Sequence, residues 1–312
     1  MKYTEPATKT AIKNMILQSE NITFEGNISN NQDLHFITLE SVLNDNNIVF
    51  SKNIERTLGI INDKNIYTNL GLILSDDCPF TIKIAVYKDD TYDTFLDRKE
   101  FKGSLLKQID NTIEYLNMSN KIYGEIKSIN REDTFDYPIK AIREAVLNAV
   151  VHKEYSINSS IFIHVFSNNI KIVSLGSLYG DITLNDIIMG GISVTRNPKL
   201  QSILLRFNKV ESLGTGIPRI MESYSNNVKK PEIIISDNLF TIILPKFESR
   251  DNSKDTIKNY LKNNEYITRD KAEELLNVGK TKAVGILNDL LDNNFIKVYG
   301  KGRSIKYMKN IS

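Results

Sequence analysis

The sequence has a single cysteine, Cys78, among 312 residues. One cysteine excludes an intramolecular disulfide framework and a cysteine-based zinc cluster, and it is typical of a protein kept in a reducing cytosol. The first ten residues, MKYTEPATKT, lack the apolar core of a signal peptide. No apolar run approaches the roughly 20 residues that a membrane span requires. These absences favour a cytoplasmic location. The three histidines are scattered along the chain, so a histidine-built metal site is not expected.

The net charge is small, +2, but it is unevenly distributed along the chain. Residues 279–312 hold seven basic side chains and two acidic ones, a balance of +5, which leaves −3 for residues 1–278. A basic end on a slightly acidic body favours a polyanionic partner at the C-terminus, although a solvated basic tail is the simpler alternative.

The length of the chain exceeds the roughly 250 residues at which single cores stop growing, so two or three domains are expected. Strand patterns occur at 80–88, 160–167, 169–176 and 232–245, and helical patterns at 101–118, 138–152 and 197–207. The predicted fold class is α+β, a mixed sheet with helices on one face. We expect a helical region at 1–70, the α/β domain at 71–247 and a small domain at 248–312, after the polar linker FESRDNSKD.

The C-terminal domain has the elements of a winged helix-turn-helix: three short helices followed by two strands around Gly300-Lys-Gly302. The third helix would present Lys280, Thr281 and Lys282 to the major groove of double-stranded DNA. Lys301 and Arg303 would contact phosphates from the wing. A winged helix used for protein contact or dimerisation is the alternative, and a homodimer on paired half-sites is compatible with either. The fragment GKT (279–281) is not a phosphate loop, because Glu274 stands where that loop needs a glycine.

A polar row runs through the apolar stretch REAVLNAVVHKEY (143–155). Glu144, Asn148 and His152 are four residues apart, so they lie on one face of a helix. Burying three polar side chains is unfavourable unless each finds a partner. The residues alone therefore leave two interpretations: a ligand site, or a hydrogen-bonded core network at the edge of a helix.

Four segments in order carry a family resemblance: YPIKAIREAVLNAVVHKEYS, VSLGSL, RNPKL and ESLGTGIPRI. Over residues 65–245 the chain resembles the C-terminal domain of RecG-related transcriptional regulators, which is related to the GHKL ATPases such as gyrase and MutL. The usual N-terminal neighbour in that family is an AlbA-like, Schlafen-type domain that binds nucleic acid. Of that N-terminal domain, we expect this sequence to contain only the tail, which the stretch YTEPATKTAIKNMI resembles.

The resemblance implies ATP and Mg²⁺ as cofactors and assigns roles to named residues. Asn148 would coordinate the Mg²⁺ and Glu144 would be the general base for hydrolysis. Gly176 stands at the first glycine box, Gly214, Thr215 and Gly216 form the second, and Arg196 and Asn197 lie in the segment that would cover the nucleotide. His152 belongs to the same pocket, with no sharper role than fixing the end of the helix.

One departure limits the resemblance. GHKL ATPases use an aspartate before the first glycine box to accept a hydrogen bond from adenine, whereas this chain has Ser174 and Leu175 there. Asp181 could replace it only with a shifted loop. The expected function is a DNA-binding transcriptional regulator whose GHKL-like domain binds a nucleotide or other small effector. An ATPase coupled to a nucleic-acid transaction and a scaffold with a degenerate pocket are the alternatives.

Overall fold

The computed structural model describes residues 23–120, 122–127, 130–177, 183–190, 195–207, 209, 215–247, 253–276, 278–300 and 305–310. Contacts between residues divide the chain into two compact units, with the boundary between residues 248 and 249. Each unit has a hydrophobic core of its own.

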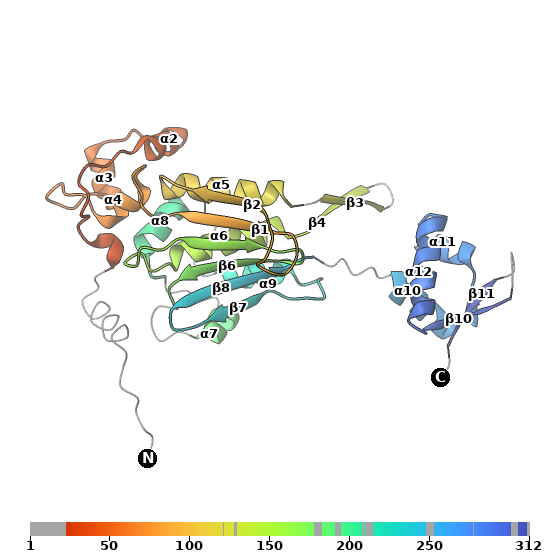
Figure 1. The fold of residues 1–312 in the computed structure, drawn as a ribbon. Coiled ribbons are helices and arrows are strands. Elements are labelled where there is room, and N and C mark those ends of the chain that lie inside the picture. The colour runs from red at the N-terminus through yellow and green to blue at the C-terminus, as the bar shows by residue number, and fades with distance from the viewer. Residues whose placement is uncertain are drawn as a thin grey trace, which may run out of the picture. The chain divides into compact units, whose positions relative to one another are not determined.

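The first unit is built on a six-stranded mixed sheet (Figure 1). Across the sheet the order is β2 (Phe95–Phe101), β1 (Ile82–Tyr87), β5 (Ile161–Val165), β6 (Asn169–Leu175), β8 (Leu239–Pro245) and β7 (Glu232–Ile235). Strands β1 and β5 are parallel, and every other neighbouring pair is antiparallel. A separate hairpin joins β3 (Ile122–Lys127) to β4 (Asn130–Phe135).

Helices pack against one face of this sheet. The helical elements of the first unit are η1 (Phe24–Gly26), α2 (Ile37–Asp45), α3 (Lys52–Leu58), α4 (Asn69–Leu74), α5 (Leu105–Met118), α6 (Ile139–Val151), α7 (Leu184–Gly190), α8 (Pro198–Arg206) and α9 (Gly216–Ser223). Alternate strand residues such as Ile82, Ile163 and Ile172 are buried in the same cluster as the apolar faces of α5 and α6. The predicted α+β class with a mixed sheet is therefore confirmed. The sequence patterns missed β2, whose residues are almost all exposed, and the β3–β4 hairpin.

Helix α6 is the central helix of the layer. Its run of alanine, leucine and valine supplies both helix formers and apolar surface, and Pro138 precedes its first turn as the N-cap. From Ala141 to Val151 only Arg143 is not fully buried. The helix ends at His152, whose backbone N–H bonds to the carbonyl of Asn148. The polar row of the sequence is thus buried among the apolar residues of this helix.

The N-terminal helical region is fastened to α8 by a buried carboxylate. Glu25 is fully buried, and its two oxygens accept hydrogen bonds from the backbone N–H groups of Lys199 (2.7 Å) and Leu200 (2.9 Å). These N–H groups belong to the first turn of α8, where backbone N–H groups have no acceptor within the helix. Burial raises the pKa of Glu25 above its ordinary value, although both backbone bonds act in the opposite direction. Glu25 therefore caps a helix that lies 174 residues further along the chain.

In its described residues, the second unit contains three helices and a three-stranded antiparallel sheet in the order β10-β11-β9. Along the chain the elements are α10 (Ser253–Asn263), β9 (Tyr266–Ile267), α11 (Arg269–Leu276), α12 (Lys280–Asp292), β10 (Ile296–Tyr299) and β11 (Lys306–Lys309). Its core includes Ile257, Leu287 and Ile296. Among the described residues, no helix is both long enough and apolar enough to span a membrane. The stretch YTEPATKTAIKNMI and most of the linker lie outside those residues.

We expect Glu25→Gln to loosen the first turn of α8. The amide of glutamine keeps one accepting oxygen, but its NH₂ group faces the other backbone N–H. One buried donor then has no acceptor, which costs about 2 kcal/mol of local stability. Hydrogen exchange at Leu200 should then be about 30-fold faster than in the wild type. The matched control Glu40→Gln changes an exposed carboxylate and should leave this rate unchanged. Equal rates in Glu25→Gln and the wild type would contradict the capping role.

Candidate nucleotide site and nucleic-acid interface

The row on α6 occupies three successive turns of the helix. The exposed fractions of Glu144, Asn148 and His152 are 8%, 9% and 3%. The side-chain amide of Asn148 donates through Nδ2 to the carbonyl of Glu144, at 2.7 Å. That bond uses one of the two N–H groups of Nδ2, and Oδ1 is the atom of this side chain that can accept a donor or contact a cation.

Gly216 lies directly against this row. A Cβ atom at Gly216 would be 2.6 Å from Nδ2 of Asn148 and 3.0 Å from Oε2 of Glu144, closer than side chains approach. Thr215 is the N-cap of α9, so the helix begins at the point of contact. Backbone N–H groups in the first turn of a helix have no partners within it, and the helix dipole favours anions there. The structure therefore places Gly216, from the second glycine box, in contact with Glu144 and Asn148 of the row.

Arg219 is a site residue that the sequence patterns missed. Its Nη1 atom lies 3.6 Å from Oε1 of Glu144. It stands three residues after Gly216 on α9, and that helical spacing was the available signal. With Arg219, the site combines a guanidinium, a carboxylate, an amide and a helix N-terminus.

Gly176 lies at the other end of α6. Its φ of +131° is a conformation that residues with a side chain rarely adopt. A Cβ atom there would be 2.5 Å from the carbonyl oxygen of His152. The backbone N–H of Glu154 donates to the carbonyl of Leu175, at 2.7 Å, which fixes the end of β6 to the residues that follow α6.

The segment before α8 is anchored to the same place. Nη1 of Arg196 lies 2.6 Å from Oε2 of Glu154. The amide of Asn197 donates to the carbonyls of Val151 (2.9 Å) and Lys153 (2.8 Å). Both residues that the resemblance places over the nucleotide thus hold the C-terminal end of α6. Gly214 and Asp181 lie outside the described residues.

His152 is held as a neutral imidazole. Its ring stacks on Phe240, with centroids 5.5 Å apart and planes 28° apart, and Nδ1 has no hydrogen-bond partner among the described residues. Burial, with a smaller contribution from the charge of Arg196, lowers the pKa of His152 from 6.5 to about 4. The ring therefore carries no charge at neutral pH.

The residues around Asn148 fit a Mg²⁺ that arrives with phosphates. In the described part of the chain, no cluster of three histidine, cysteine or acidic side chains could hold a metal unaided. Magnesium usually keeps several waters and takes one or two protein oxygens together with phosphate oxygens. Oδ1 of Asn148 is such an oxygen, and the first turn of α9, which begins at Gly216 beside Asn148, would face the phosphates.

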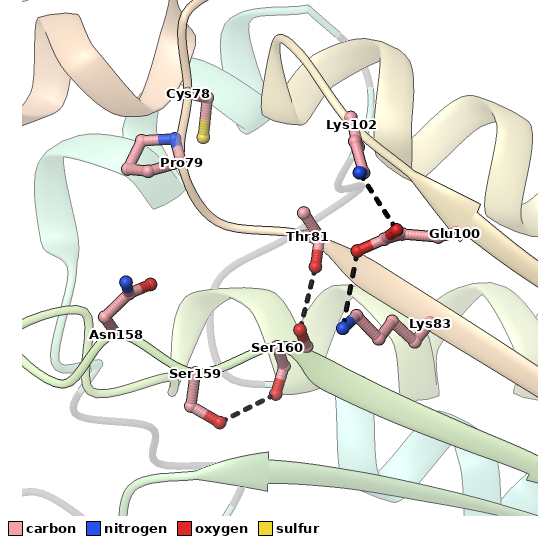
Figure 2. Close-up of a pocket in the computed structure, with 9 residues that line it drawn as sticks. All are labelled: Cys78, Pro79, Thr81, Lys83, Glu100, Lys102, Asn158, Ser159 and Ser160. Atoms are coloured by element: carbon pink, nitrogen blue, oxygen red, sulfur yellow. Dashed lines mark hydrogen bonds and ion pairs between the residues drawn. The ribbon is translucent and has the colours of Figure 1, made fainter.

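The structure also contains a cavity of about 400 Å³ (Figure 2). Its walls come from the ends of β1, β2 and β5 and include Cys78, Lys83, Glu100 and Lys102. Both lysines contact Glu100, at 3.4 Å and 3.0 Å. Burial raises the pKa of Cys78 to about 12, so its thiol is not a nucleophile at neutral pH. The cavity contains none of the sequence-predicted site residues.

The residues predicted to contact DNA lie in the second unit. Lys280, Thr281 and Lys282 are exposed and form the first turn of α12, after the N-cap Gly279. Lys301 and Arg303 lie outside the described residues.

Comparisons with known proteins bear on the first unit. Residues 158–244 match the family model described as "Putative ATP-dependent DNA helicase recG C-terminal". This match supports a RecG-related, GHKL-like domain, and it covers Gly176 and Gly216 but begins after α6. The crystal structure of the DIP2311 protein from Corynebacterium diphtheriae has a similar fold, with a TM-score of 0.64 and 16% identity over 97% of this chain and 68% of that chain. No curated protein matches this chain.

We expect the buried neutral state of His152 to make stability fall in acid. Its folded pKa of about 4 lies below 6.5, so the unfolded chain binds more protons between these values. The contribution of neutral His152 to the free energy of unfolding is fully present above about pH 6.5. Up to about 3 kcal/mol of it is lost as the pH falls toward 4. In denaturant unfolding from pH 7.5 to 4.5, His152→Phe, which keeps a ring against Phe240, should lose less stability than the wild type. Parallel losses would contradict this assignment.

Proposed function

We propose that this protein is a DNA-binding transcriptional regulator whose first unit binds a purine nucleotide with Mg²⁺. The observation that carries the nucleotide part is the absence of room for a side chain at Gly216, beside Asn148 and Glu144. A glycine backbone at a helix N-terminus can approach phosphate closely. The family match over residues 158–244 supports the same assignment.

The DNA part rests on the second unit. Its order of helix, strand, two helices and two strands supports a winged helix, in which α12 would be the recognition helix. Lys280, Thr281 and Lys282 are exposed on its first turn, the part that meets base edges in such domains. The positive balance of residues 279–312 favours a polyanion over an uncharged protein surface.

An ATPase acting on nucleic acid is the second candidate function. It is favoured by Glu144, a carboxylate at the phosphate end of the proposed pocket and therefore in position to orient an attacking water. Arg219, 3.6 Å from that carboxylate, would compensate negative charge on the phosphates. Binding without hydrolysis is sufficient for the regulator.

A thermal-shift panel of Mg²⁺ with ATP, ADP and GTP tests the nucleotide part. A ligand that binds only the folded state increases the free energy of unfolding, by about 2.7 kcal/mol at a ligand concentration a hundred times its Kd, and so raises the melting temperature. We expect the wild type to be stabilised and Gly216→Ala to lose the shift, because the added methyl occupies the contact with Asn148. The control Gly285→Ala adds a methyl where no atom lies within 4 Å and should keep it. No shift in the wild type at millimolar nucleotide would contradict the proposal and favour a scaffold.

Binding of double-stranded DNA tests the second unit. We expect Lys280→Ala with Lys282→Ala to weaken binding and to reduce the slope of log K against log salt by about 2, because each phosphate contact releases about one counterion. Lys83→Ala with Lys102→Ala removes the same charge from the first unit and should leave DNA binding unchanged. If both double variants bind DNA as the wild type does, α12 is not the recognition helix.

A further inference from the structure

The cavity at the ends of β1, β2 and β5 is lined mostly by polar side chains (Figure 2). Thr81 directly precedes β1 and Ser160 directly precedes β5, and their hydroxyl oxygens are joined by a hydrogen bond of 2.8 Å. Asn158 and Ser159 continue the wall along the segment that leads into β5. The volume of about 400 Å³ falls within the range of small-molecule sites. None of the described residues that line this cavity is aromatic.

Two lysines share one carboxylate in the wall of the cavity. Lys83 and Glu100 are cross-strand partners on β1 and β2, so their side chains project from the same face of the sheet. Nζ of Lys83 lies 3.4 Å from Oε1 of Glu100, and Nζ of Lys102 lies 3.0 Å from Oε2. The hydrogen bond from Lys102, with a smaller contribution from Lys83, lowers the pKa of Glu100. An ammonium group has three donors, so both lysines keep donors for a ligand after this contact.

A third ammonium group is buried behind the wall of the cavity. Lys153 is 1% exposed, and its Nζ donates to the carbonyl oxygens of Glu154 and Ile157 at 3.4 Å each. Ile157 directly precedes Asn158, which lines the cavity, and the charge of Lys153 also acts on the thiol of Cys78, another lining residue. Burial lowers the pKa of Lys153 to about 8, so most of its molecules are charged at neutral pH. A buried charge is ordinarily paired.

We propose that this cavity binds a small sugar phosphate, with the phosphate at Lys83 and Lys102 and the sugar hydroxyls at Asn158 and Ser159. Figure 2 shows the two lysines on one side of the cavity and Asn158 and Ser159 on the other. Two positive charges on one carboxylate, with Lys153 behind them, favour an anion. Phosphate has three acceptor oxygens, so it can accept from both ammonium groups at once.

The sugar part of the ligand follows from the rest of the lining. Hydroxyl and amide side chains both donate and accept hydrogen bonds, and so do the hydroxyl groups of a sugar. A nucleobase would find no ring on which to stack among the described lining residues. The cavity shares no residue with the nucleotide site proposed above, and the two proposals do not depend on each other.

Amide NMR spectra of the full chain, titrated with glucose 6-phosphate, inorganic phosphate or glucose, test this inference. We expect millimolar glucose 6-phosphate to shift the backbone signals of Ser159, Ser160 and Lys102. Inorganic phosphate should bind about tenfold more weakly, because it lacks the hydroxyl groups that would bond to Asn158 and Ser159. Glucose should cause no shift at these residues, because it carries no charge.

Substitutions at the charged wall have opposite expected signs. Lys102→Ala should weaken glucose 6-phosphate about tenfold, and Lys102→Arg, which keeps the charge, should stay within about threefold of the wild type. Glu100→Gln should bind about threefold more tightly or better, because it removes the carboxylate that competes for both ammonium groups. The control Lys88→Ala removes an exposed ammonium group directly after β1, outside the cavity, and should leave the affinity unchanged.

The outcomes are distinct from those of the nucleotide test. If glucose 6-phosphate shifts none of the lining residues, or binds no more tightly than inorganic phosphate, the inference is wrong. Shifts confined to Gly216 and α9 would also contradict it, while they would support phosphate binding at the proposed nucleotide site. Weaker binding in both Lys102→Ala and Glu100→Gln would indicate a structural role for the charged wall and would likewise contradict the inference. Tighter binding in Glu100→Gln cannot come from a loss of folding.

Discussion

The contact between α6 and the first turn of α9 is the constraint on which the candidate site depends. Two polar side chains, Glu144 and Asn148, are buried among the apolar residues of α6, and only a residue without a side chain fits beside them at Gly216. This packing brings the N-terminus of one helix against a carboxylate and an amide of another. Arg219 then supplies a positive charge within 3.6 Å of the carboxylate. A side chain at position 216 would separate all of these groups.

The other end of α6 is held by connections from distant parts of the chain. Asn197 bonds to the carbonyls of Val151 and Lys153, and Gly176 lies against the carbonyl of His152. Glu25 caps the helix that begins directly after Asn197. The segment before α8 and the end of β6 therefore meet at the C-terminal end of α6, and the N-terminal region holds the start of α8.

Much of this arrangement could be predicted because it follows from local periodicity. Spacing of four residues places Glu144, Asn148 and His152 on one helical face whatever the tertiary fold, and the strands at 161–165 and 169–175 follow from β-branched runs. Strand β2, with the sequence FLDRKEF, could not be recognised, since an exposed edge strand needs no apolar alternation. The cap by Glu25 has no local signal, because its partners are fixed only by tertiary packing.

The central claim is that phosphate binds at the N-terminus of α9, next to Asn148. A crystal structure of the protein with Mg²⁺ and a non-hydrolysable ATP analogue tests it most directly. The account predicts phosphate density at the first turn of α9, with Mg²⁺ coordinated by Oδ1 of Asn148. Nucleotide density in the cavity lined by Lys83 and Lys102, with the α6–α9 contact unchanged, would contradict it.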